Sequence, residues 1–385
     1  MVITEKRISE LDATLARVVE ESGAPAAQYA LAMNGGVVHG GALGHADADS
    51  RFCIFSASKP VFASLILHLS SAGTLDLGSR VADLWPEFAA GGKHDVTIEQ
   101  LLLFTAGIPS CWPARDSAID PARRAAELAA ASLETAPGTA YAYHPVSAHW
   151  VLAEIVRRTT GLDHREALRR LILDPLGLDR MQLGVPSDEQ QGIEPAELVG
   201  AYDLEFAEAT LGQPLTSAQL DAVNALALGI GRDPALIAAG VPGGGVISDA
   251  SSLALFYQAL LHGHPALWDD DVLSSATRES LNVLADEGRG GAPANRTVGC
   301  LTIAGDGVPY AELPALGLRL PVRHHGTRTS ARTFGHPGFG GQLGFADPDH
   351  GYSFAFLISG AERDGIAGAR RDREIADAVA GVFSG

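Results

Sequence analysis

Residues 51–69 read RFCIFSASKPVFASLILHL, and within them Ser56 and Lys59 form the one S-x-x-K motif of the chain. Lysine is scarce here, because the chain has only 3 lysines against 25 arginines. Residues 51–55 predict a short strand, and the apolar run 61–69 predicts a core helix that follows the serine. Since residues three apart share a helix face, Lys59 is expected to lie over Ser56. A desolvated lysine amine can take the proton of a serine hydroxyl and make it a nucleophile.

The composition restricts the classes of function. The chain has 385 residues, a mass of 40.0 kDa and a formal net charge of -18. That charge argues against nucleic acid and anionic membrane as partners, because both bind basic surfaces. It also disfavours strongly anionic substrates, although a local basic pocket would override it.

Cysteine usage and the N-terminus indicate the compartment. Three cysteines (Cys53, Cys111 and Cys300) are too few, and odd in number, for a disulfide framework. The first residues, MVITEKR, lack the apolar stretch of a secretion signal. No uncharged apolar run reaches about 18 residues, so no membrane span is expected. We therefore expect a cytoplasmic, reduced protein without nucleic-acid or membrane partners, and its oligomeric state stays open.

The two ends of the chain predict strands and the middle predicts helices. An amphipathic helix near the N-terminus precedes apolar runs 28–33 and 37–41, which Asn34-Gly35-Gly36 joins as a hairpin. Near the C-terminus, the strand candidates before a final amphipathic helix are 298–304, 318–324, 332–336, 341–346 and 352–359. The termini are therefore expected to build one antiparallel sheet in an α+β fold.

The middle of the chain is expected to form an inserted unit. Helices are predicted at 96–104, 121–132, 148–158 and 164–173. The predicted division is a sheet domain of residues 1–72 plus 241–385 and a helical domain of residues 73–240. Within the helical domain, prolines break the pattern of residues 185–240, which we expect to shape the pocket as a lid or cap.

Two further segments join the S-x-x-K motif. Residues 137–145 read PGTAYAYHP and place Tyr143 just before a helix, and residues 334–341 read FGHPGFGG between two strands. A helix start offers free N–H groups to a developing oxyanion, and glycines let a ligand approach the backbone closely. The three segments together predict an acyl-transfer site.

This trio, in this order, resembles the serine β-lactamase and penicillin-binding-protein superfamily. Residues 73–77 (GTLDL), 101–109 (LLLFTAGIP) and 174–178 (DPLGL) are similar to the same family. The resemblance covers roughly residues 8 to 383 and is closest to the class C-like branch, within it to the family VIII carboxylesterases. It implies a β-lactamase/transpeptidase-like fold, an antiparallel sheet flanked by helices with an inserted, mostly helical domain.

The resemblance also implies a role for each residue that matches. Ser56 would be the acylated nucleophile, and Lys59 would keep its proton mobile. Tyr143 would be the base for acylation and for the deacylating water, with its pKa lowered by Lys59. The backbone amides of Ser56 and Phe339 would form the oxyanion hole. His336 stands where the family has the lysine of its K-T-G motif.

Three departures from the family pattern narrow the expected substrate. Pro145 stands where the family usually has an asparagine that binds a substrate amide, and proline offers no donor. Pro337 stands where penicillin-recognising members carry a hydroxyl for the ligand carboxylate. His336 is a weaker anion anchor than lysine near pH 7. These changes favour an ester without a carboxylate beside the scissile bond.

Each candidate site residue could also have a purely structural role. Ser56 and Lys59 could be an incidental helix start, and Tyr143 a core tyrosine. His336, Gly338 and His144 are the expected substrate-binding residues, although histidines also serve as structural side chains. Cys53 has no basic partner near it in sequence and is expected to be a packed thiol.

Other chemistries find no support in the motifs. No H-E-x-x-H motif or Cys/His ligand spacing is present, so neither a metal nor another cofactor is expected, and His324-His325 are expected to be ordinary surface or core residues. The glycine-rich stretch 338–344 leads into a strand rather than a helix, which excludes a dinucleotide loop. There is no G-x-S-x-G motif of the α/β-hydrolases.

The leading hypothesis is a serine hydrolase that cleaves small carboxylic esters through a Ser56 acyl-enzyme. An acyltransferase would share the first half-reaction and use an alcohol or amine in place of water. A β-lactamase, D-amino-acid peptidase or amidase is disfavoured by Pro145 and Pro337. A catalytically silent scaffold is the non-enzyme alternative, and the three intact residues Ser56, Lys59 and Tyr143 count against it.

Overall fold

Strands from both ends of the chain form one six-stranded antiparallel sheet in the computed structural model, which describes residues 4–384. Its order is β10-β13-β14-β15-β1-β2. The strands are β1 (Ala26–Met33), β2 (Gly36–Gly44), β10 (Thr302–Ile303), β13 (Phe334–Gly335), β14 (Leu343–Asp347) and β15 (Tyr352–Ile358). The central pair joins the N-terminal hairpin to the C-terminal strands, with Tyr29 opposite Phe356. The predicted α+β class and its single antiparallel sheet are confirmed.

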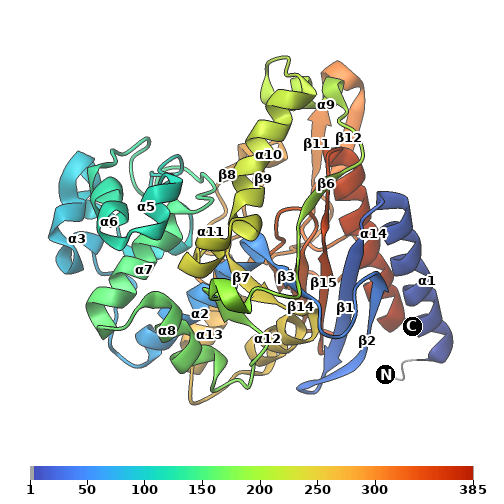
Figure 1. Cartoon of the computed structure of the whole chain (residues 1–385), viewed down its shortest axis with the longest axis horizontal. Helices are drawn as coiled ribbons and strands as arrows, with labels where there is room; N and C mark the ends of the chain where they lie inside the picture. Colours follow the sequence, from blue (N-terminus) through green and yellow to red (C-terminus); the bar gives the residue numbers. More distant parts are fainter. Residues whose placement is uncertain (1–3, 385) are drawn as a thin grey trace.

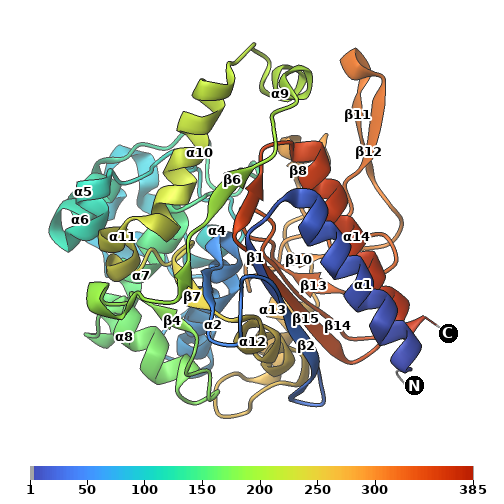
Figure 2. The ribbon, with the colours of Figure 1, turned by 45° about the vertical axis from the view of Figure 1, so that its right-hand side comes forward.

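Helices cover both faces of this sheet (Figures 1 and 2). On one face lie α1 (Glu5–Ser22) and α14 (Gly365–Phe383), and on the other lies α12 (Ala250–His262). Strand β15 shows why, because its side chains alternate between two separate apolar cores. Phe354 and Phe356 belong to the core under α1 and α14, whereas Ala355 and Leu357 belong to the core that also contains α2 (Ser58–Ser71).

Residues 73–240 contribute no strand to the six-stranded sheet. Their helices are α3 (Val81–Leu84), α4 (Ile98–Leu102), α5 (Arg115–Ile119), α6 (Pro121–Ala130), α7 (Ser147–Thr160), α8 (His164–Leu168), α9 (Leu204–Leu211), α10 (Ser217–Arg232) and α11 (Pro234–Ala239). Figure 1 shows α3 and α5 to α8 gathered beside the sheet layers, while α9 and α10 form a projecting arm. The predicted domain boundaries at residues 72 and 240 stay a prediction.

Smaller strand pairings connect the two parts of the chain. Strands β3 (Arg51–Cys53) and β7 (Val246–Ser248) lie in a four-stranded sheet with β4 (Gln182–Leu183) and β5 (Ile193–Glu194). Strand β6 (Glu197–Val199) pairs in parallel with β16 (Gly360–Glu362). Of the helices in residues 4–384, none is both long enough and apolar enough to cross a membrane.

The expected strand 318–324 is shorter and lies elsewhere. Only Leu318–Pro321 is extended, as β12, and it pairs with β11 (Tyr310–Leu313) in a separate hairpin that projects from the body in Figure 2. This stretch pairs with its own hairpin neighbour instead of a strand of the six-stranded sheet. The chain then turns at His325, whose φ of 58° is outside the extended region.

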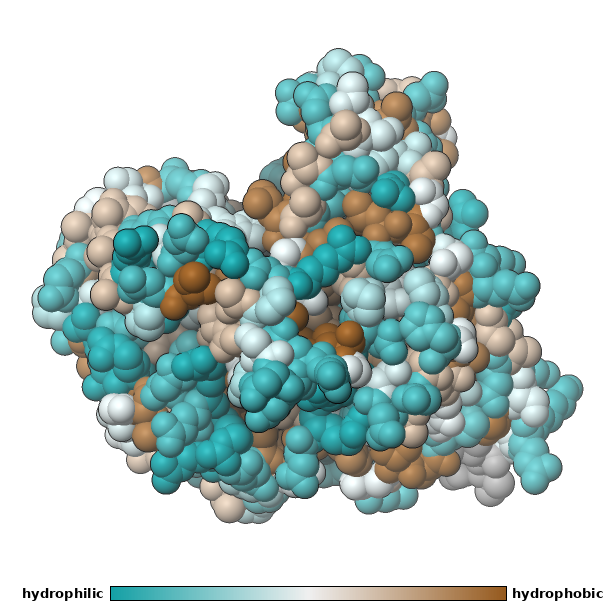
Figure 3. Space-filling model, in the orientation of Figure 1, coloured by the Kyte–Doolittle hydropathy of each residue, from teal (hydrophilic) through white to brown (hydrophobic). Residues whose placement is uncertain are grey.

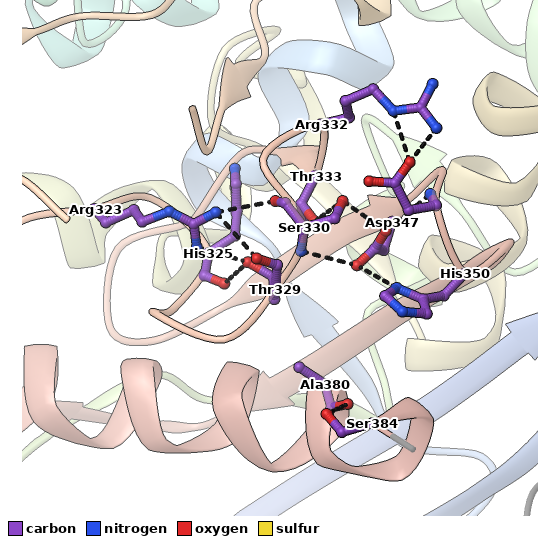
Figure 4. Close-up of polar contacts among 11 residues, drawn as sticks. Arg323, His325, Thr329, Ser330, Arg332, Thr333, Asp347, His350, Ala380 and Ser384 are labelled. Atoms are coloured by element: carbon purple, nitrogen blue, oxygen red, sulfur yellow. Dashed lines mark hydrogen bonds and ion pairs between the residues drawn. The ribbon is translucent and has the colours of Figure 1, made fainter. Parts of the chain in front are cut away.

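The segment between β12 and β13 is held by polar side chains (Figure 4). Arg323 donates to Thr329 Oγ1 and to the Ser330 carbonyl, both at 3.0 Å. The Ser330 hydroxyl donates to the buried carboxylate of Asp347 at 2.7 Å, and His350 Nδ1 lies 3.1 Å from the same carboxylate. Because Asp347 ends β14, this network fixes the approach of the chain to β13, which leads directly into residues 336–339.

Candidate active site

The candidate nucleophile lies on a strained turn between β3 and α2. Phe55 has a φ of 44°, a left-handed conformation that is unfavourable for a bulky side chain. Its ring packs edge-to-face on Phe339, with 5.5 Å between the ring centroids. Ser56 follows in a single 3₁₀ turn and is half-buried at the wall of a cavity. The turn therefore brings its hydroxyl to the cavity and its backbone amide next to the 338–341 segment.

Lys59 lies under Ser56 and is completely buried. Its Nζ is 3.2 Å from Ser56 Oγ and donates to the carbonyl oxygens of Pro145 and Gly243, each at 2.7 Å. No carboxylate lies within ion-pair distance of this amine among residues 4–384, and burial lowers the pKa of Lys59 to about 7. A neutral amine has two N–H groups, which the two carbonyls accept, and its lone pair then faces Ser56.

Tyr143 is the third residue that the sequence predicted, and it lines the same cavity. Lys59 Nζ lies 5.0 Å from the centroid of its ring. Burial raises the pKa of Tyr143 to about 12, and the charge of Arg296 and the hydroxyl of Ser56 only partly oppose this rise. The expectation that Lys59 lowers this pKa is therefore corrected: burial dominates, and Lys59 is not among the groups that lower the pKa of Tyr143.

The turn after β13 supplies the second expected amide. A Cβ on Gly338 would lie only 2.2 Å from the carbonyl oxygen of Ile54, so only glycine permits this contact. The close approach carries the Phe339 amide beside the Ser56 turn. Within residues 4–384, neither the Ser56 nor the Phe339 backbone N–H donates to another protein group. Two free amides at one wall suit a developing oxyanion.

His336 is 2% exposed and reaches the cavity from the end of β13. Because a carbonyl only accepts, its 2.6 Å contact with Pro337 O assigns the proton to Nδ1 and leaves Nε2 as an acceptor. Burial together with the charges of Arg296 and Lys59 holds the pKa of His336 well below its usual value. Nε2 has no hydrogen-bond partner in the described part of the chain. The ring is therefore neutral and makes no cationic anchor.

His144 does not line the cavity, contrary to its expected substrate-binding role. Its ring is fully buried, and both nitrogens are engaged by the backbone. Nε2 accepts from the Ile108 N–H at 3.1 Å, and Nδ1 donates to the Ala142 carbonyl at 2.5 Å. The residue instead holds the 142–145 segment in place. Cys53 is a packed thiol as predicted, buried and with its pKa raised to about 12.

The cavity has a volume of about 610 Å³, within the range of small-molecule sites. Part of its wall is apolar and comes from the projecting arm: Val223, Leu226, Ala227 and Ile230 of α10 line the cavity, and so does Trp112. Val223, Leu226 and Trp112 are 62%, 64% and 40% exposed. Figure 3 shows hydrophobic side chains gathered around the base of this arm. Part of the 185–240 stretch thus borders the candidate site.

Another part of the cavity wall is basic, which the motifs did not indicate. Arg289, Arg296 and His324 line it next to Tyr143 and His336. The two arginines follow β8 (Ala285–Asp286) and β9 (Ala292–Pro293), in a stretch without periodicity or a catalytic motif. From the sequence we expected only that a local basic pocket, if present, would allow an anionic substrate despite the negative net charge. No three His, Cys, Asp or Glu side chains of residues 4–384 are grouped to hold a metal ion.

Comparisons with known proteins concern the sequence and the fold of this chain. A sequence model of the family described as Beta-lactamase matches residues 11–377. The chain is 27% identical over 322 residues to the protein "Esterase/beta-lactamase LipL" of Mycobacterium tuberculosis, which covers 80% of this chain and 69% of LipL.

Two solved structures share the fold. A penicillin-binding protein homologue from Caulobacter crescentus has a TM-score of 0.73 at 26% identity, with 98% of each chain covered. A family VIII carboxylesterase has a TM-score of 0.67 at 24% identity, with 98% of this chain and 99% of that chain covered. The β-lactamase/transpeptidase-like fold implied by the sequence is confirmed.

Proposed function

This chain belongs to the beta-lactamase family, and we propose that it is a serine hydrolase that cleaves small carboxylic esters through an acyl-enzyme on Ser56. The observation that carries the proposal is the buried amine of Lys59. Its Nζ has two backbone carbonyl acceptors and Ser56 Oγ as its third neighbour. Burying an amine costs free energy, and a proton acceptor with a pKa near 7 is what acyl transfer requires of it.

Acylation follows from these positions. The neutral Lys59 amine takes the Ser56 proton while Oγ forms a bond to the ester carbonyl carbon. The backbone amides of Ser56 and Phe339 receive the oxyanion. As the carbon–alkoxy bond breaks, the Tyr143 hydroxyl gives its proton to the departing alkoxide, and the Lys59 ammonium then reprotonates Tyr143. A phenol with a pKa of about 12 is well matched to an alcohol leaving group.

Deacylation reverses the proton path. Water takes the place of the departed alcohol and gives its proton to Tyr143, whose own proton passes to Lys59. Lys59 then returns a proton to Ser56 Oγ as the acid leaves. Tyr143 thus serves as acid in the first half-reaction and as base in the second. The second role is the one expected for it from the sequence, as the base for the deacylating water.

Two prolines favour esters over β-lactams. Pro145 uses its carbonyl to accept from Lys59 at 2.7 Å and has no side-chain donor for a substrate amide. Pro337 likewise offers no hydroxyl, and its carbonyl accepts from His336. Both positions therefore support the nucleophile site and give nothing to a bound amide or lactam. We expect negligible nitrocefin turnover relative to simple esters.

The test measures p-nitrophenyl acetate and p-nitrophenyl butyrate turnover by the wild type and by Ser56→Ala. The expected result is turnover by the wild type, loss of at least about 10³-fold in kcat for the variant, and a mass increase of one acyl group on Ser56. Equally slow turnover by the wild type and Ser56→Ala would refute the proposal that the chain is an esterase. Adding alcohols to the assay then identifies the acyl acceptor. If the acyl group is transferred to the added alcohol faster than to water, the chain is an acyltransferase.

A further inference from the structure

Arg296 is a buried cation beside the catalytic residues. Its side chain is 6% exposed, yet it lines the cavity. The guanidinium lies among three aromatic rings, 5.1 Å from the centroid of Phe104, 5.9 Å from Tyr141 and 5.5 Å from Tyr143. Nη2 donates to the Tyr141 hydroxyl at 3.2 Å, whereas Nε and Nη1 have no acceptor among residues 4–384.

The charge of Arg296 has no counter-ion in the described chain. No carboxylate of residues 4–384 lies within 4.0 Å of it or of Arg289. Asp286 is the acidic group near both arginines, and burial raises the pKa of its carboxyl. Arg289 contacts His324, whose neutral ring brings no negative charge. This wall of the cavity therefore carries two guanidinium groups without a carboxylate in ion-pair contact, in a protein whose net charge is -18.

An isolated buried cation is costly unless an anion completes it. Arg296 faces a cavity large enough for a substrate, and its planar guanidinium matches a carboxylate. We propose that Arg296, with Arg289 beside it, binds a carboxylate of the substrate, so that the preferred substrates are esters that carry a second, ionised carboxyl group. This inference rests on the proposed function at Ser56 and names the substrate class of that site.

This carboxylate would be bound by other residues than those at positions 336 and 337. Pro337 and the neutral His336 occupy the positions beside the nucleophile and supply no anion anchor. The basic wall lies beside Tyr143, with the Arg296 guanidinium 5.5 Å from its ring, and apolar side chains of α10 line the same cavity. A substrate with an apolar part against Leu226 and an anionic end at Arg296 would match both walls. The substrate would then lack a carboxylate beside the scissile ester bond, as expected from the sequence, but would carry one at its far end.

The test compares rigid ester pairs that differ only in charge. The first pair is 4-acetoxybenzoate and 4-acetoxybenzamide, with the carboxylate in the alcohol part. The second is mono-4-nitrophenyl terephthalate and its primary amide, with the carboxylate in the acyl part. For each pair, we take the ratio of kcat/KM for the carboxylate to kcat/KM for the amide. This ratio is divided by the same ratio of the uncatalysed hydrolysis rates, which corrects for the difference in intrinsic reactivity.

The proposal expects a corrected ratio of about tenfold or more in favour of the carboxylate for one of the pairs. In Arg296→Gln the ratio should fall to near one, and in Arg296→Lys to an intermediate value. Arg124→Gln is the matched control, because Arg124 also stacks on an aromatic ring, 3.9 Å from Trp150, but does not line the cavity. A wild-type ratio near one for both pairs, or an unchanged ratio in Arg296→Gln, overturns the proposal.

A binding measurement keeps the proposal independent of turnover. Calorimetric titration of Ser56→Ala with each of the four esters should give about tenfold tighter binding of at least one carboxylate over its amide. The double variant Ser56→Ala/Arg296→Gln should lose this difference. Tight carboxylate binding without turnover by the wild type would refute the esterase and leave the anion site standing. Equal binding of carboxylate and amide throughout would refute the anion site, whatever the turnover.

Discussion

Titration of Lys59 is expected to govern both the activity and the stability of this protein. Burial lowers the pKa of its amine from 10.5 to about 7. A shift of this size corresponds to about 5 kcal/mol between the charged and neutral forms. Only the neutral amine can take the Ser56 proton. We therefore expect kcat/KM for p-nitrophenyl butyrate to fall about tenfold per pH unit below pH 7 and to level off above it.

The free energy of unfolding should also depend on pH because of Lys59, and the direction of this dependence can be worked out. Between pH 7 and 10.5 the unfolded chain keeps this lysine protonated, whereas the folded chain does not. The unfolded state thus binds one more proton, and the free energy of unfolding rises with pH in this window. Measured relative to Lys59→Met, which removes the amine, it should rise by about 2 to 3 kcal/mol from pH 7.5 to 9.5.

Two measurements check this reasoning. Urea unfolding of the wild type and Lys59→Met across that pH range gives the difference in the free energy of unfolding. The ester assay from pH 5 to 9 shows whether kcat/KM falls below pH 7. If the stability difference is constant with pH and kcat/KM does not fall near pH 7, the folded protein keeps Lys59 charged. The role of the amine as the base for Ser56 would then be refuted.

Three further predictions concern other parts of the site. Tyr143→Phe should lower kcat by about 10² to 10⁴-fold with an unchanged circular dichroism spectrum, and unaltered kcat would remove the phenol from the mechanism. Gly338→Ala should lower ester kcat/KM by at least about tenfold and reduce stability, since its Cβ would lie 2.2 Å from Ile54 O. Gly229→Ala is the control, because a Cβ there has no neighbour closer than 4.0 Å. Equal activity and stability of the two variants would contradict the close approach of Gly338 to Ile54. Leu226→Ala should reduce the octanoate-to-acetate preference by a few fold in a chain-length series of p-nitrophenyl esters, whereas an unchanged preference would place the acyl chain elsewhere.

Local features of the sequence predicted the parts of the site that short-range geometry fixes. The three-residue spacing of Ser56 and Lys59 on a helix start was enough to bring the amine under the hydroxyl. The hairpin signal at residues 34–36 and the apolar C-terminal strands predicted a sheet built from both ends. The glycines of residues 334–341 were expected to let a ligand approach the backbone, whereas the close neighbour of Gly338 is the carbonyl oxygen of Ile54.

Features that depend on the tertiary fold could not be predicted in this way. Histidine next to the tyrosine suggested a site residue, but packing directs His144 to the backbone of Ile108 and Ala142. The alternating residues 318–321 indicate a strand but not its partner, and the partner is β11. Arg296 and Arg289 lie in an irregular stretch, so only the folded chain brings their charges to Tyr143.

The charges around Tyr143 lead to a last consequence for catalysis. Two cations flank its ring, Lys59 Nζ at 5.0 Å and the Arg296 guanidinium at 5.5 Å, while His336 nearby is neutral. Near pH 7 the Lys59 amine loses its charge, whereas a guanidinium stays protonated at any pH the protein tolerates. Arg296 is then the positive charge already beside the phenol in deacylation, when the Tyr143 proton passes to the neutral Lys59 amine. Arg296→Gln should therefore slow neutral esters as well, through the phenol, and slow carboxylate esters more, through the lost anchor. Because the first effect divides out of the ratio of kcat/KM values, the ratio reports the anchor and the absolute rate on the amide reports the support of Tyr143.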